Sequence, residues 1–195
     1  MFSLSLMIST FCIVFVAELP DKTALAALIL STKYRARDVI IGAWLAFLVQ
    51  TIVAVVAGGF LTLLPAEPIR IASGLGFLAF AALALKRNEK ADEKEEAATV
   101  EQADSTRPVW LISFLVIFAA EWGDLTQLAT AAIVARNGQP LSVGIGAVLA
   151  LWAVTVVAAY SGSRLGKALK PRLLNMISAA LFAAIGLFIV YKALV

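Results

Sequence analysis

The sequence predicts an all-α integral membrane protein with six transmembrane helices, arranged as two inverted three-helix repeats. Three observations lead to this fold class. The 195 residues are 62% hydrophobic, with a mean hydropathy of +0.93, far above that of a soluble domain. The charged residues, 15% of the chain, are clumped, so that long stretches carry almost none. The pattern of the first half also returns in the second half.

Each charge-poor run is interpreted as one membrane span, because about 20 apolar residues cross a bilayer as a helix. No alternation of period two favours a barrel, so helices are the expected spanning form. The first run lacks the basic start of a signal peptide, and we expect it to be retained. The first and fourth runs are each interrupted by a short charged motif. The six predicted spans are 1–17 continuing through 23–32, 39–64, 68–86, 108–120 continuing through 125–135, 137–163 and 173–191.

The basic residues of the loops predict the orientation. The first, third and fifth loops carry twelve Lys and Arg residues, and the remaining loops and the tail carry three. The positive-inside rule then places the central loop in the cytoplasm and both termini outside. We expect a multi-pass protein of the bacterial plasma (inner) membrane, with the lipid bilayer as its surroundings. Because topology explains the basic residues, no nucleic-acid partner is expected. A homodimer is compatible with so small a bundle, but no interface is specified.

Two halves are predicted around a charged linker: 1–86 and 108–195 are the three-helix repeats, and 87–107 is cytoplasmic and solvated. Three helices per half is an odd number, so the second half enters the membrane from the opposite face, as in many secondary transporters. The repeat pairs residues of similar type, with shifts of one or two positions in the loops: Phe11 with Phe114, Phe15 with Phe118, Glu18 with Glu121, Asp21 with Asp124, Gly42 with Gly146 and Phe77 with Phe182.

Four carboxylates stand in apolar surroundings, as Glu18 with Asp21 and Glu121 with Asp124. A carboxylate inside a membrane is costly and usually faces a cavity or a partner on an ion pathway. Positions three apart share a helix face, so each pair points one way. We expect the two pairs to meet near the midplane. Four carboxylates without any histidine form a hard oxygen ligand set, which suits Ca²⁺, Mg²⁺ or Mn²⁺.

Helix breaks are expected inside both motifs. Pro20 removes a backbone donor, and Gly123 loosens the equivalent point. An unwound segment would bring carbonyl oxygens and the hydroxyls of Thr23 and Thr126 toward the acids. Lys22 either points inward as a counter-charge to them or reaches a neighbouring hydrated region.

Three further residues are open to two interpretations. Gln127, next to the second motif, and Gln50 with Thr51 either line the cavity or make core hydrogen bonds.

Without metal, four ionised carboxylates in a low dielectric would repel one another, so the empty cluster should bind protons as a coupled group. Metal and protons would then compete for the same oxygens. Combined with alternating exposure of the site, this competition predicts cation/proton exchange.

The stretches "ELPDKT" and "EWGDLT" resemble the paired E-x-G-D-[KR]-[ST] signature of the small cation/proton exchangers that include the Golgi manganese transporter and bacterial MneA-type manganese exporters. The resemblance covers essentially the whole chain. It implies export of Mn²⁺, or Ca²⁺, in exchange for H⁺, with Glu18, Asp21, Glu121 and Asp124 as ligands. No prosthetic group is implied. Pro20 and Leu125 depart from the signature.

Two other classes compete with this interpretation. An exporter of an amino acid or of another metal would need separate charges or soft ligands, and neither is evident. An intramembrane aspartyl enzyme would use two facing acids, which the symmetric pairs do not exclude. We expect a transporter, not an enzyme.

Overall fold

The computed structural model describes residues 2–18, 22–63, 65–86, 98, 106–168 and 171–194, and every long element in them is a helix. In chain order the helices are α1 (Leu4–Glu18), α2 (Lys22–Lys33), α3 (Ala36–Leu61), α4 (Ala66–Lys86), α6 (Val109–Ala120), α7 (Leu125–Asn137), α8 (Pro140–Ala168) and α9 (Pro171–Leu194). Most of the predicted linker, 87–105 apart from Ala98, lies outside the described residues.

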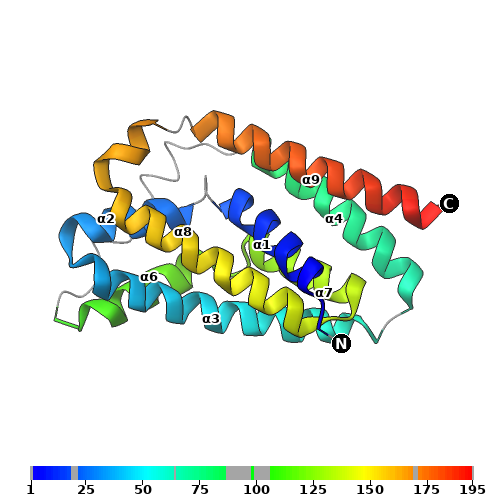
Figure 1. Cartoon of the computed structure of the whole chain (residues 1–195), viewed down its shortest axis with the longest axis horizontal. Coiled ribbons are helices and arrows are strands. Elements are labelled where there is room, and N and C mark those ends of the chain that lie inside the picture. Colours follow the sequence, from blue (N-terminus) through cyan, green and yellow to red (C-terminus); the bar gives the residue numbers. More distant parts are fainter. Residues whose placement is uncertain are drawn as a thin grey trace.

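The helices pack chiefly between the two halves of the chain. Helix α3 contacts α6, α7 and α8, while α8 contacts α1, α2 and α3. Helices α4 and α9 lie side by side along one edge of the molecule (Figure 1). Because the extensive contacts join one half to the other, the halves form a single body.

The predicted pairs of equivalent residues make equivalent contacts. Gly42 in α3 lies against Trp110 and Ser113 of α6, and Gly146 in α8 lies against Met7 and Thr10 of α1. A Cβ at either glycine would collide with backbone atoms, so both glycines permit close helix packing.

Aromatic rings repeat as well. Phe11 stacks on Phe15 with centroids 5.6 Å apart, and Phe114 stacks on Phe118 at 5.4 Å, both with interplanar angles of 12°. Phe77 and Phe182, themselves a predicted pair, touch each other at 5.9 Å. The internal repeat in the sequence is therefore matched by repeated packing.

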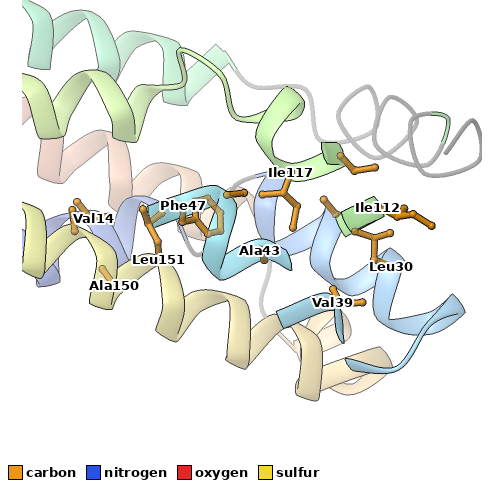
Figure 2. Packing of buried hydrophobic residues seen from close by; sticks show 13 residues of the cluster. Val14, Leu30, Val39, Ala43, Phe47, Ile112, Ile117, Ala150 and Leu151 are labelled. Atoms are coloured by element: carbon orange, nitrogen blue, oxygen red, sulfur yellow. The ribbon is translucent and has the colours of Figure 1, made fainter. Parts of the chain in front are cut away.

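One buried apolar cluster joins five helices. Figure 2 shows Val14 of α1, Leu30 of α2, Phe47 of α3, Ile117 of α6 and Leu151 of α8 within this cluster. Helix α3 also has an exposed apolar face, on which the side chains of Ile41, Ile52 and Val56 are each at least half exposed. An apolar exterior around an apolar core is what a helix in lipid requires.

Two described helical segments are long and apolar enough to cross a membrane, Ala36–Leu61 and Pro140–Tyr160. The pair α6 and α7 provides a third if it is counted as one span, bent by 70° at its break. Leu4–Glu18, Ile71–Lys86 and Ala179–Ala193 are shorter apolar helices. These counts cover the described residues, and the full set of six spans in an inverted arrangement stays a prediction.

Candidate metal centre

The break between α6 and α7 is built by the backbone conformations of Glu121, Gly123 and Asp124. Helix α6 ends at Ala120, and the N–H of Glu121 makes the last helical bond, to the Ile117 carbonyl at 3.0 Å. Gly123 then adopts φ +76°, which L side chains rarely adopt. Asp124 is extended and starts α7 as its N-cap. Gly123 therefore stops the helix outright, a sharper effect than the loosening expected from the sequence.

The side chain of Asp124 is held by the helix it caps. One carboxylate oxygen accepts a hydrogen bond from the backbone N–H of Gln127 at 2.8 Å, and the other accepts from the hydroxyl of Thr126 at 2.6 Å. Asp is among the preferred N-cap residues because it satisfies such donors and because the positive end of the helix dipole favours its charge. These bonds fix one acid of the second motif beside the break.

Three acids from both motifs converge. Glu18, at the end of α1, Glu121 and Asp124 each offer a carboxylate oxygen, and these oxygens all lie within 4.8 Å of one another. Glu18 is fully buried, Glu121 is 2% exposed, and Asp124 is half-buried. Residues 103 positions apart in the sequence thus meet inside the protein.

The remaining candidates divide into two groups. Thr126 and Gln127 both contact Asp124, as described above. Asp21 lies outside the described residues, as do the side chains of Lys22 and Thr23. Their predicted roles as ligand, counter-charge and supporting hydroxyl stay predictions.

A residue whose role the sequence left open, Gln50 of α3, also reaches the break. Its side-chain amide donates to the carbonyl of Phe118 in the last turn of α6, at 3.1 Å. The Phe118 carbonyl is thus oriented by α3, whereas we expected such freed carbonyls to turn toward the acids. A glutamine in the middle of a long apolar span indicates a specific hydrogen bond. The sequence alone does not show that the acceptor is the Phe118 carbonyl.

A small cavity adjoins Asp124 on the side of α3 and α7. It has a volume of about 10 Å³, and its polar lining includes Gln50, Thr51 and Thr130. This is about the room that one water molecule needs. Apolar side chains of Phe47, Ala54 and Leu151 complete the lining, so Asp124 adjoins a small space of mixed polar and apolar character.

A chemical consequence follows from the donor set. Closely spaced carboxylates in a low dielectric cannot all stay ionised without a counter-charge, because repulsion and desolvation act together. A divalent cation with oxygen ligands, or bound protons, would relieve both effects. The cluster is thus chemically suited to hold either.

The apolar helical fold and the buried acids at a helix break define the class of protein. Buried acids beside a broken helix are typical of membrane proteins that transport ions. The family model "Divalent cation/proton antiporter GDT1" matches the chain twice, at residues 6–92 and 109–195. The chain belongs to the GDT1 family of divalent cation/proton antiporters, and the resemblance noted in its motifs is confirmed.

Curated relatives agree with this membership. The GDT1-like protein sll0615 of Synechocystis is 32% identical over 181 residues, covering 86% of this chain and 87% of that protein. The chloroplastic GDT1-like protein 2 of rice is 29% identical over 89% of this chain, and the chloroplastic protein PAM71 of Arabidopsis thaliana is 28% identical over 89%. This chain spans 57% and 53% of those two plant proteins. No solved structure matches the chain.

Proposed function

We propose that this protein is a secondary transporter that exports Mn²⁺ from a bacterial cell in exchange for H⁺. The single observation that carries the proposal is the convergence of Glu18, Glu121 and Asp124 to within 4.8 Å inside an apolar protein. Membership of a divalent cation/proton antiporter family supports the reaction class. Ca²⁺, which takes the same oxygen ligands, is the alternative cargo.

The proposed site takes its ligands from both halves. Glu18 and Asp21 come from the first motif, and Glu121 and Asp124 come from the second. The three acids that converge carry a charge of −3 when ionised, and a divalent cation reduces this to −1. Protons neutralise the same oxygens when the cation leaves. Exclusive occupancy by metal or by protons couples the two fluxes in opposite directions.

Alternating access follows from the proposed architecture. Six spans form two inverted repeats, with both termini outside and the central loop in the cytoplasm, and the acids lie near the bilayer midplane. Rocking of one repeat against the other would expose the acids to each side in turn. The matched packing of Gly42 and Gly146 supports an inverted pair of halves.

Purified protein in liposomes with an imposed pH gradient tests the proposal. Fluxes of Mn²⁺, Ca²⁺ and Mg²⁺ are compared between the wild type and Glu18→Gln, Asp21→Asn, Glu121→Gln and Asp124→Asn. Glu67→Gln is a matched control, because Glu67 is an exposed acid in the first turn of α4. We expect proton-driven Mn²⁺ flux in the wild type and the control and its loss in the four variants. Wild-type vesicles that move no divalent cation would contradict the proposed function.

A further inference from the structure

Two side-chain amides brace the break between α6 and α7. Gln127 lies in the first turn of α7, and the N–H of Gly123 donates to its side-chain oxygen at 2.7 Å. Its own backbone N–H donates to Asp124. Gln127 thus donates to the cap residue and accepts from the residue before it, an arrangement related to the capping box but shifted by one residue. Gln127 therefore ties the left-handed glycine to the start of α7.

The brace extends across to α3. The side-chain nitrogen of Gln127 donates to the backbone carbonyl of Gln50 at 3.3 Å, and the side-chain nitrogen of Gln50 donates to the carbonyl of Phe118 at 3.1 Å. Phe118 precedes the break and Gln127 follows it. One turn of α3 thus binds both sides of the segment that carries Glu121 and Asp124.

The two halves of the chain differ at these positions. In the repeat alignment, the residue equivalent to Gln127 is Ala24, and the residue equivalent to Gln50 is Val154. Neither alanine nor valine can donate or accept a side-chain hydrogen bond. The repeat therefore retains the acids in both motifs but has these two amides only around the second motif.

We propose that Gln50 and Gln127 are positioning residues, which fix the break between α6 and α7 and so hold Glu121 and Asp124 at the spacing that the cation requires. This inference rests on the proposed function. It assigns to α3 of the first half the task of shaping the motif of the second half. During transport, the middle of α3 and the second motif move as one unit.

The test compares Gln127→Met, Gln50→Met and the double variant with the wild type in liposomes. Met keeps a similar length but has no amide. We expect KM for Mn²⁺ to rise about ten-fold in each single variant, as the loss of part-buried hydrogen bonds allows, with kcat within about two-fold. The double variant should raise KM by less than the product of the single effects, because both amides act on one break.

If the two glutamines only stabilised the fold, their replacement would lower the apparent kcat and leave KM unchanged, because partial unfolding reduces the number of active molecules. Asn137→Leu is the matched control, because Asn137 is an exposed residue at the far end of α7 whose amide also donates to a backbone carbonyl, that of Ile133. Its KM should equal that of the wild type.

Amide hydrogen exchange of the peptide spanning 118–128 provides a readout that needs no cation. Exchange there should be faster in Gln127→Met and unchanged in Asn137→Leu. An unaltered KM in both glutamine variants, with an active wild type, would overturn the inference alone. A wild type that carries no divalent cation would overturn the proposed function, and the inference would fall with it.

Discussion

Glu18 and Glu121, equivalent residues of the two halves, present carboxylate oxygens within 4.8 Å of each other in the interior of the protein. Each side chain is at most 2% exposed. Placing two acids so close costs free energy, and a fold retains such an arrangement where function requires it. This pair, together with Asp124, is the centre of the proposed cation site.

Replacing one of these acids should weaken cation binding. We expect Glu121→Gln to lower the affinity for Mn²⁺ by more than about 100-fold, since even the loss of an outer partner of a metal ligand costs 10–100-fold. Calorimetric titration of protein in nanodiscs measures this. Glu67→Gln should bind Mn²⁺ like the wild type, and equal binding by Glu121→Gln would remove Glu121 from the site.

Substitution of Gly123 should disrupt the break. Its φ of +76° makes Gly123→Ala strained by about 1–2 kcal/mol, and we expect a lower melting temperature together with a loss of Mn²⁺ transport. Thermal unfolding and liposome flux measure the two effects.

Two other glycines provide controls for that variant. Gly138 has φ +62° at the C-cap of α7, so Gly138→Ala should lower stability by a similar amount but keep transport. Gly59 lies in α3 with open space around its Cβ position, so Gly59→Ala should lower neither the melting temperature nor Mn²⁺ transport. If Gly123→Ala transported like the wild type, the left-handed turn would not be needed for the site.

Replacing Gly42 or Gly146 with alanine should disrupt the close packing between the halves to a similar extent. A Cβ at Gly42 would collide with the backbone carbonyl of Trp110, and one at Gly146 would collide with that of Met7. We expect either change to Ala to destabilise the protein by about 1–3 kcal/mol, as overpacking typically does. Unfolding in mixed detergent measures both. A large effect at one glycine with none at the other would contradict the matched packing.

An aromatic contact between α3 and α8 should matter for stability alone. Trp44 and Trp152 stack with centroids 4.6 Å apart, and each indole N–H donates to the backbone carbonyl of the other residue, at 3.2 and 3.1 Å. Trp44→Phe should lose one hydrogen bond, costing about 0.5–1.5 kcal/mol. We expect a lower melting temperature with an unchanged KM for Mn²⁺. A changed KM would show that this contact also shapes the site.

Much of this arrangement could be predicted from the sequence, because lipid restricts the choices. Apolar runs predict helices, and a repeated acid in each half predicts a shared location for Glu18 and Glu121. Periodicity alone could not show that Gly123 would reverse its φ, because glycine also occurs inside continuous helices. Pairings between distant residues, such as Gln50 with Phe118, depend on helix rotation and depth, and one sequence does not specify these.

Competition between protons and metal should be visible in transport kinetics. If both occupy the same carboxylates, the apparent KM for Mn²⁺ at the loading side should rise as the pH of that side falls, while the maximal rate at saturating Mn²⁺ changes less. Initial uptake rates at several pH values, with the opposite side held constant, measure this. A KM that does not depend on pH would argue for separate binding sites.

In the proposed transporter, Glu18, Glu121 and Asp124 together hold the cation. Electron paramagnetic resonance of Mn²⁺ added to protein in nanodiscs tests it most directly, because bound and free Mn²⁺ give distinct spectra. We expect one tightly bound Mn²⁺ per chain in the wild type and none in the triple variant Glu18→Gln, Glu121→Gln, Asp124→Asn. Undiminished binding by a folded triple variant would contradict it.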